Sequence, residues 1–165
     1  MLFALLIAMT IAAVTGGTTP DRAYGLAGTW SCQSSALGSG TISFTRESDG
    51  SIGATDDFTL SGATSHFDEL YRLDPAGPFW RWTSTWRDHS DFKEAATGGI
   101  WTAQKWFFDG TVTRRPHSHD TETHRIRMIY TWISDSSFER EFEIYEDGVW
   151  KTTSSSVCRR SAASS

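Results

Sequence analysis

The sequence predicts an all-β fold, a single antiparallel up-and-down β-barrel of eight to ten strands. Short segments of alternating apolar and polar residues follow one another, separated by turn residues. No convincing amphipathic helix is present, and the only two cysteines lie in the first and last of these segments. Because the first and last strands of a closed barrel are neighbours, a bond between Cys32 and Cys158 would hold the two chain ends together. A β-sandwich is the alternative.

The chain begins with an apolar segment that precedes the expected barrel. Residues 1–14 carry no charged side chain and are too few to span a membrane, which takes about 20 residues. Residues 1–16 therefore resemble a secretory signal peptide, with an N-terminal anchor or a mis-assigned start as alternatives. Export predicts a secreted or periplasmic protein without stable membrane insertion after processing, whereas in the cytosol the two cysteines would stay buried thiols. The barrel domain is expected over residues 26–160 and a disordered tail over residues 161–165.

Turn signals divide the barrel domain into its strands. Strands are expected over residues 27–35, 39–47, 51–61, 65–73, 78–87, 98–108, 110–117, 123–134, 137–146 and 148–159. The clearest turns are Ser48-Asp49-Gly50, Asp74-Pro75-Ala76-Gly77, Asp109-Gly110 and Asp147-Gly148. The Asp109-Gly110 pair predicts a tight hairpin between Phe108 and Thr111. Residues 88–97 form the longest irregular segment and are a candidate lid loop.

Composition narrows the class of partner. The net charge of -5, without a basic patch, argues against nucleic acid. Eight Trp, ten Phe and four Tyr give more large apolar surface than a small core requires, which favours a small hydrophobic or amphipathic ligand. No cofactor or metal is expected. The segment from His117 to His124 contains His117-Ser118-His119, but it follows Pro116 and is interpreted as a solvated loop, with weak metal binding as the alternative.

Arg140 is the inward-facing residue that most needs a partner. Alternation along residues 137–146 places it on one face with Phe138 and Phe142, while the glutamates occupy the other face. A buried guanidinium requires a counter-charge, and Glu69 and Asp56 lie on the inward faces of their own strands. Two interpretations stay open. One is an internal ion pair, and the other is an anchor for a ligand carboxylate, which arginine binds in bidentate fashion.

Aromatic side chains supply the other candidates for a ligand site. Trp80, Trp82 and Trp86 share one face of their segment and form either core or the wall of a cavity. Residues 148–159 place Trp150 and a run of hydroxyls inward. The candidate ligand-binding residues are therefore Arg140, Trp80, Trp82, Trp86, Tyr130, Trp132, Phe142, Glu69 and Tyr71.

The two ends of the domain resemble those of lipocalins and the wider calycin group. Gly28-Thr29-Trp30 matches the Gly-x-Trp signature of the first strand, and Cys158-Arg159-Arg160 matches the ending of small secreted bacterial lipocalin-like proteins of uncharacterised function. The resemblance implies a calycin-type barrel, export, a disulfide between the cysteines, and Arg159 or Arg160 packed across Trp30 at a closed end. Nitrobindins, which bind haem through a histidine, share the Gly-Thr-Trp start, and His124 would be that histidine here.

Three functions remain in view. The sequence favours a barrel that binds a small hydrophobic or amphipathic ligand, with Arg140 fixing its polar end. The second is a calycin-type cyclase or isomerase acting on a small hydrophobic substrate, with Glu69, Tyr71 or Tyr130 as the acid or base. The third is a filled core without a ligand. The sequence leaves enzymatic activity open.

Overall fold

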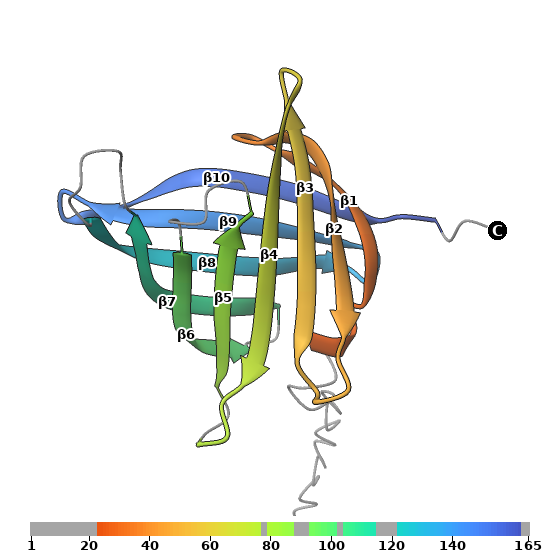
Figure 1. Ribbon diagram of the computed structural model, residues 1–165, viewed down its shortest axis with the longest axis horizontal. Coiled ribbons are helices and arrows are strands. Elements are labelled where there is room, and N and C mark those ends of the chain that lie inside the picture. The colour runs from red at the N-terminus through yellow and green to blue at the C-terminus, as the bar shows by residue number, and fades with distance from the viewer. Residues whose placement is uncertain (1–22, 77–78, 88–92, 102–103, 115–121, 163–165) are drawn as a thin grey trace, which may run out of the picture.

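The computed structural model describes residues 23–76, 79–87, 93–101, 104–114 and 122–162, which form one β-barrel (Figure 1). Its ten strands are β1 (Gly28–Ser34), β2 (Gly38–Arg46), β3 (Ile52–Leu60), β4 (Ala63–Leu73), β5 (Trp80–Trp86), β6 (Lys93–Trp101), β7 (Lys105–Arg114), β8 (Glu122–Ser134), β9 (Ser137–Glu146) and β10 (Val149–Arg160). Each strand pairs antiparallel with the next, and β1 also pairs with β10, which closes the barrel. The predicted up-and-down barrel is confirmed, and the β-sandwich is excluded.

The core lies between two groups of strands that run across each other. In Figure 1, β2 to β5 stand upright while β8 to β10 run from side to side. Alternation sends every second side chain into the space between the groups. The largest fully buried side chains there are Trp80, Trp82, Trp106, Tyr71, Tyr130, Phe58, Phe108, Phe138, Leu26, Ile42, Ile52 and Ile126.

Two hairpins turn through pairs of residues with left-handed backbone. Ser61 and Gly62 connect β3 to β4 with φ of 53° and 85°, and Asp147 and Gly148 connect β9 to β10 with φ of 52° and 83°. A two-residue loop with positive φ at both positions matches the right-handed twist of the strands. The turn predicted at Asp147-Gly148 is confirmed.

The hairpin predicted at Asp109-Gly110 is wrong. Both residues lie inside β7, which pairs without a break with β8 on this stretch. The carboxylate of Asp109 faces two arginines of the neighbouring strand, Arg125 at 3.5 Å and Arg127 at 3.6 Å. Because these cross-strand charges compensate the carboxylate, Asp109 is suited to the sheet as well as to a turn.

The connections on either side of β6 also differ from the expectation. The strand ends at Trp101 and β7 begins at Lys105, so the chain reverses earlier than predicted. At its other end β6 begins at Lys93, which shortens the irregular segment predicted over residues 88–97. Residues 88–92 of that segment, the candidate lid, lie outside the described residues.

A β-bulge in β10 reverses the face predicted for the start of that strand. The register shifts by one residue between Thr152 and Ser154. After the bulge the predicted inward face is correct, as buried Ser156 shows. Before it, Trp150 faces outward, and the guanidinium of Arg127 lies 3.7 Å from the centre of its ring. The prediction of an inward Trp150 is therefore wrong.

A disulfide joins the two ends of the barrel sequence. Cys32 and Cys158 are direct partners across the β1–β10 pair, with Cα atoms 4.1 Å apart, and their sulfur atoms are bonded. The bond expected between the cysteines is confirmed. It links residues 126 positions apart in the chain. A disulfide is consistent with an oxidising extracellular or periplasmic environment.

One end of the barrel is sealed around Trp30 and is called the Trp30 end below. The indole Nε1 of Trp30 donates a hydrogen bond of 2.7 Å to the carbonyl oxygen of Leu26, whose side chain is fully buried. The guanidinium of Arg160 lies 4.3 Å from the centre of the Trp30 ring and donates to two backbone carbonyls of residues 25–27. Arg160, not Arg159, is the arginine that packs across the tryptophan.

The chain termini add two observations. The signal peptide expected over residues 1–16 lies outside the described residues. The backbone N–H of Ser161, the first residue of the predicted tail, donates to the carbonyl of Thr29 at 2.9 Å, so regular contacts extend one residue beyond β10. No helix in the described part of the chain has the length and apolar character that crossing a membrane requires.

Candidate functional site

Aromatic side chains pack the barrel from the Trp30 end to its middle. Trp80 and Trp82 are almost completely buried, and Trp80 meets Trp106 edge to face with ring centres 5.5 Å apart. Trp132 is half-buried at the same end and stacks on Phe138 at 5.6 Å. The structure therefore places two of the predicted ligand-binding residues, Trp80 and Trp132, in ring-to-ring packing, and buries a third, Trp82.

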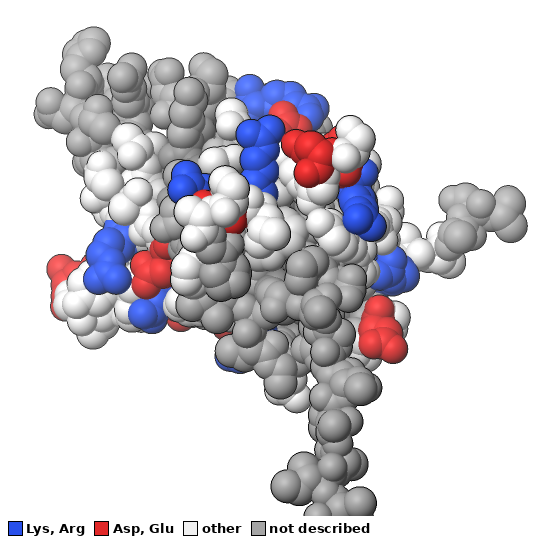
Figure 2. Space-filling view, turned by 90° about the horizontal axis from the view of Figure 1, so that it is seen from below, with Lys and Arg blue, Asp and Glu red and all other residues white. Residues whose placement is uncertain are grey.

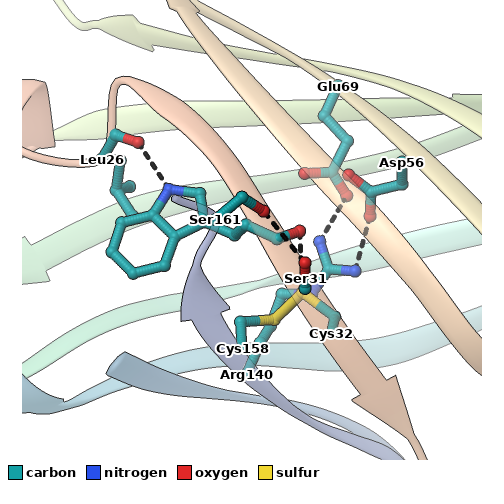
Figure 3. Close-up of a disulfide and its surroundings, with 9 residues drawn as sticks. Leu26, Ser31, Cys32, Asp56, Glu69, Arg140, Cys158 and Ser161 are labelled. Atoms are coloured by element: carbon teal, nitrogen blue, oxygen red, sulfur yellow. Dashed lines mark hydrogen bonds and ion pairs between the residues drawn. A yellow bond between two sulfur atoms is a disulfide. The ribbon is translucent and has the colours of Figure 1, made fainter. Parts of the chain in front are cut away.

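The middle of the barrel holds a buried charged group. Nη2 of Arg140 donates to Oδ2 of Asp56 at 2.5 Å, and Nη1 donates to Oε1 of Glu69 at 3.2 Å. Figure 3 shows the guanidinium facing both carboxylates. Arg140 comes from β9, so it reaches across the interior to β3 and β4, whose alternation turns Asp56 and Glu69 inward. The predicted internal ion pair is present and includes both proposed partners.

Two tyrosines complete this group. The hydroxyl of Tyr71 donates to Oε2 of Glu69, and the hydroxyl of Tyr130 lies 2.6 Å from that of Tyr71. Because the Tyr71 hydroxyl donates its hydrogen to Glu69, the Tyr130 hydroxyl is the donor to the Tyr71 oxygen. Tyr130 is also the direct partner of Arg140 across β8 and β9. We call Arg140, Asp56, Glu69, Tyr71 and Tyr130 the Arg140 cluster.

The electrostatics of the Arg140 cluster follow from burial. Burial, and next the charge of Glu69, raise the pKa values of Tyr71 and Tyr130 above the usual range, so both phenols stay neutral. Burial lowers the pKa of Arg140, but the two carboxylates more than offset it and keep the guanidinium charged. Burial raises the pKa of Asp56 to about 7, against the attraction of Arg140 and with the repulsion of Glu69. Asp56 therefore gains or loses its proton near neutral pH.

Two buried polar atoms beside the ion pairs have no hydrogen-bond partner among the described residues. One is Oδ1 of Asp56, the carboxylate oxygen that does not meet Arg140, and the other is Oγ of Ser84. Ser84 lies directly opposite Glu69 in the β4–β5 pair and is 2% exposed. Sequence reasoning did not single out Ser84, because a missing hydrogen-bond partner depends on the packing and cannot be recognised from the sequence.

At the end of the barrel opposite Trp30, called the Phe67 end below, the described aromatic side chains are only partly buried. Phe67 and Trp86 are half-buried, and their rings stack with centres 5.4 Å apart. Phe142 is half-buried on β9, two residues beyond Arg140. Trp86 and Phe142 are the predicted ligand-binding residues on this side of the cluster, and Phe67 shares the inward face of β4 with Glu69.

The histidine segment contributes little to the described site. His117 and His119 lie outside the described residues, and His124 is half-buried on the inward face of β8, opposite Val112. Within the described ranges, no group of three His, Cys, Asp or Glu side chains is arranged to hold a metal ion. On the face seen in Figure 2, the basic and acidic side chains that are described lie interspersed, which gives that face a mixed charge.

Comparisons with known proteins leave the site to be interpreted from its geometry. No family model matches the chain, and no curated protein matches it significantly.

Proposed function

We propose that the barrel binds a small amphipathic molecule, with its polar end at the Arg140 cluster and its apolar part beside the aromatic side chains of the Phe67 end. The observation that carries this proposal is the pair of unpartnered polar atoms, Asp56 Oδ1 and Ser84 Oγ, next to buried ion pairs. Leaving a buried polar atom unbonded costs about 1–3 kcal/mol. A ligand group that bonds to such an atom removes that cost.

The side chains around the cluster support the same proposal. Ligand sites combine apolar walls with a few placed polar groups. Here the half-buried rings of Phe67, Trp86 and Phe142 occupy the Phe67 end, while Trp30 and Arg160 seal the opposite end. An amphipathic molecule that enters head group first would pass the three rings and place its head group at the Arg140 cluster.

We also propose that the chain is a lipocalin-like protein that is exported after removal of residues 1–16. The packing of Arg160 across Trp30 supports the lipocalin-like assignment, because both residues belong to the terminal motifs that suggested it. The disulfide supports export, since such bonds persist in oxidising compartments.

Native mass spectrometry of the protein purified from its own host tests the binding function. We expect a small-molecule adduct that is lost on denaturation and whose occupancy falls in Ser84→Ala. The matched control is Thr83→Ala, which changes an exposed neighbour on the other face of β5 and should keep the adduct. Protein that carries no adduct and takes up no amphipathic probe contradicts the proposal.

Asp56 favours a second candidate function, proton transfer on the bound molecule by a calycin-type isomerase or cyclase. A buried carboxyl with a pKa of about 7 and one unpartnered oxygen is able to accept and return a proton at neutral pH. Incubation of the adduct-bearing protein in deuterated water tests this function. Carbon-bound deuterium in the recovered molecule, absent with Asp56→Asn, supports it, and no incorporation with the unchanged protein contradicts it.

A further inference from the structure

The balance of charge in the Arg140 cluster bears on the kind of head group that fits it. One guanidinium lies between two carboxylates, and both tyrosines are neutral. With both acids ionised, the cluster therefore carries one net negative charge in a region where Asp56 is 1% exposed. A buried net charge is costly unless something compensates it. In the protein without a ligand, the proton held by Asp56 provides that compensation.

The hydrogen bonds of the cluster also favour a positively charged head group. Nη1 and Nη2 of Arg140 each donate to a carboxylate, whereas Asp56 Oδ1 accepts from no donor among the described residues. The hydroxyl of Ser84 is able to accept a second hydrogen bond. What the cluster lacks is thus a donor with positive charge. A ligand carboxylate would instead add a second uncompensated negative charge to the cluster.

We propose that the Arg140 cluster selects the ammonium group of a small primary amine, which donates to Asp56 Oδ1 and Ser84 Oγ while its apolar chain lies beside Phe67, Trp86 and Phe142. This inference rests on the proposed binding function and specifies its ligand class. It replaces the sequence-based interpretation in which Arg140 anchors a carboxylate. Arg140 instead positions Asp56, and the ammonium restores neutrality by taking the place of the proton on Asp56.

A pH dependence of binding follows from that competition. Above about pH 7 the carboxylate of Asp56 is ionised and is able to bind a cation. Below about pH 7 Asp56 holds a proton, which competes with the ammonium for the carboxylate. Affinity for an amine that stays protonated throughout should therefore rise between about pH 6 and about pH 8. Three charged groups act on Asp56, namely Arg140 from β9, Glu69 from β4 and Asp57 from the outer face of β3. The neutral hydroxyls of Tyr71 and Tyr130 also interact with Asp56 electrostatically.

Isothermal titration calorimetry of the full protein with octylamine, 1-octanol and octanoate tests the proposal, because the three probes share one apolar chain. At about pH 8 we expect octylamine to bind about tenfold or more tightly than octanol, and octanoate to bind least. Lowering the pH to about 6 should weaken octylamine binding severalfold and leave octanol unchanged. In Asp56→Asn the preference for octylamine and its pH dependence should both vanish.

Asp57→Asn is the matched control, since Asp57 is the next residue of β3 and faces outward toward His66. The Asp57→Asn variant should still bind octylamine more tightly than octanol and octanoate. If octanol or octanoate binds most tightly, ligand binding stands and the selection of an amine is overturned. If no probe binds, the proposed function fails together with the inference. The pH comparison in the unchanged protein remains decisive even where Asp56→Asn does not fold.

Discussion

The guanidinium of Arg160 lies 4.3 Å from the centre of the Trp30 ring, at the point where the first and last strands of the barrel meet. Arg160 also donates hydrogen bonds of 2.8 and 2.6 Å to the carbonyls of Ala27 and Gly25, which lead into β1. One side chain thus covers the buried tryptophan and fixes the entry of the chain into the barrel.

This relationship predicts unequal effects of two neighbouring arginines. Arg160→Ala should lower the free energy of unfolding by about 1–2 kcal/mol, since it removes a cation–π contact and two hydrogen bonds. Arg159→Ala removes the same charge from the outward face of β10 and should change little. Urea denaturation of both variants measures the difference, and equal losses would show that net charge, not the contact with Trp30, is responsible.

Removal of Arg140 should be far more damaging. Arg140→Met leaves Asp56 and Glu69 buried without a cation, and an uncompensated buried charge costs about 3–5 kcal/mol. Urea denaturation at neutral pH is the measurement. The control is Arg81→Met, because Arg81 forms an exposed ion pair with Asp74 at 2.7 Å, and such pairs contribute little. Similar stabilities of the two variants would contradict the internal ion pairs.

Stability should fall as the pH rises through the acidic range, and Asp56 should account for part of the fall. Folding raises the pKa of Asp56 from 3.8 to about 7, so between these values the folded state binds more protons than the unfolded chain. The free energy of unfolding contributed by this group is therefore full below about pH 4 and is lost by about pH 7.

Urea denaturation over that pH range checks the sign. Asp56→Asn should flatten the fall in the free energy of unfolding, because the amide does not titrate. Asp57→Asn should retain most of the slope, because Asp57 is the weakest of the charges that act on the pKa of Asp56. A slope that is the same in Asp56→Asn as in the unchanged protein would mean that Asp56 does not hold a proton in the folded state.

The disulfide predicts a loss of stability when both cysteines are replaced. Cys32→Ala combined with Cys158→Ala frees two positions that are 126 residues apart, which should cost about 2–5 kcal/mol because the unfolded chain gains freedom. Thermal or urea unfolding measures the loss. Intact mass with and without reductant verifies the bond in the unchanged protein, and identical masses would show that it is absent.

Gly40 predicts a steric effect inside the barrel. A Cβ atom at this position would lie 2.2 Å from the backbone oxygen of Asp57 and 2.7 Å from a ring carbon of Phe58. Gly40→Ala should therefore lower the free energy of unfolding by about 1–3 kcal/mol, as overpacking of a core does. Thr41→Ala, on the opposite face of β2, is the control. A stable Gly40→Ala would mean that β2 and β3 separate easily.

The sequence was informative wherever alternation alone decides a face. It placed Arg140 inside the barrel, and the need of a buried cation for partners then identified Glu69 and Asp56 among the acids of the chain. Its errors have local causes. The bulge in β10 turns Trp150 outward, and one inserted residue cannot be recognised from alternation. At Asp109-Gly110 a turn signal lies in mid-strand, because two arginines of the next strand neutralise the aspartate.

The bond between Cys32 and Cys158 has a consequence for how copies of this protein behave toward one another. In a barrel whose strands all pair, no strand offers a free row of N–H and C=O groups. The seam between β1 and β10 is the place where the two chain ends meet, and the disulfide holds it shut. Reduction lets that seam fray and exposes two strand edges, each a template for pairing with a second molecule. The disulfide therefore protects against aggregation as well as unfolding.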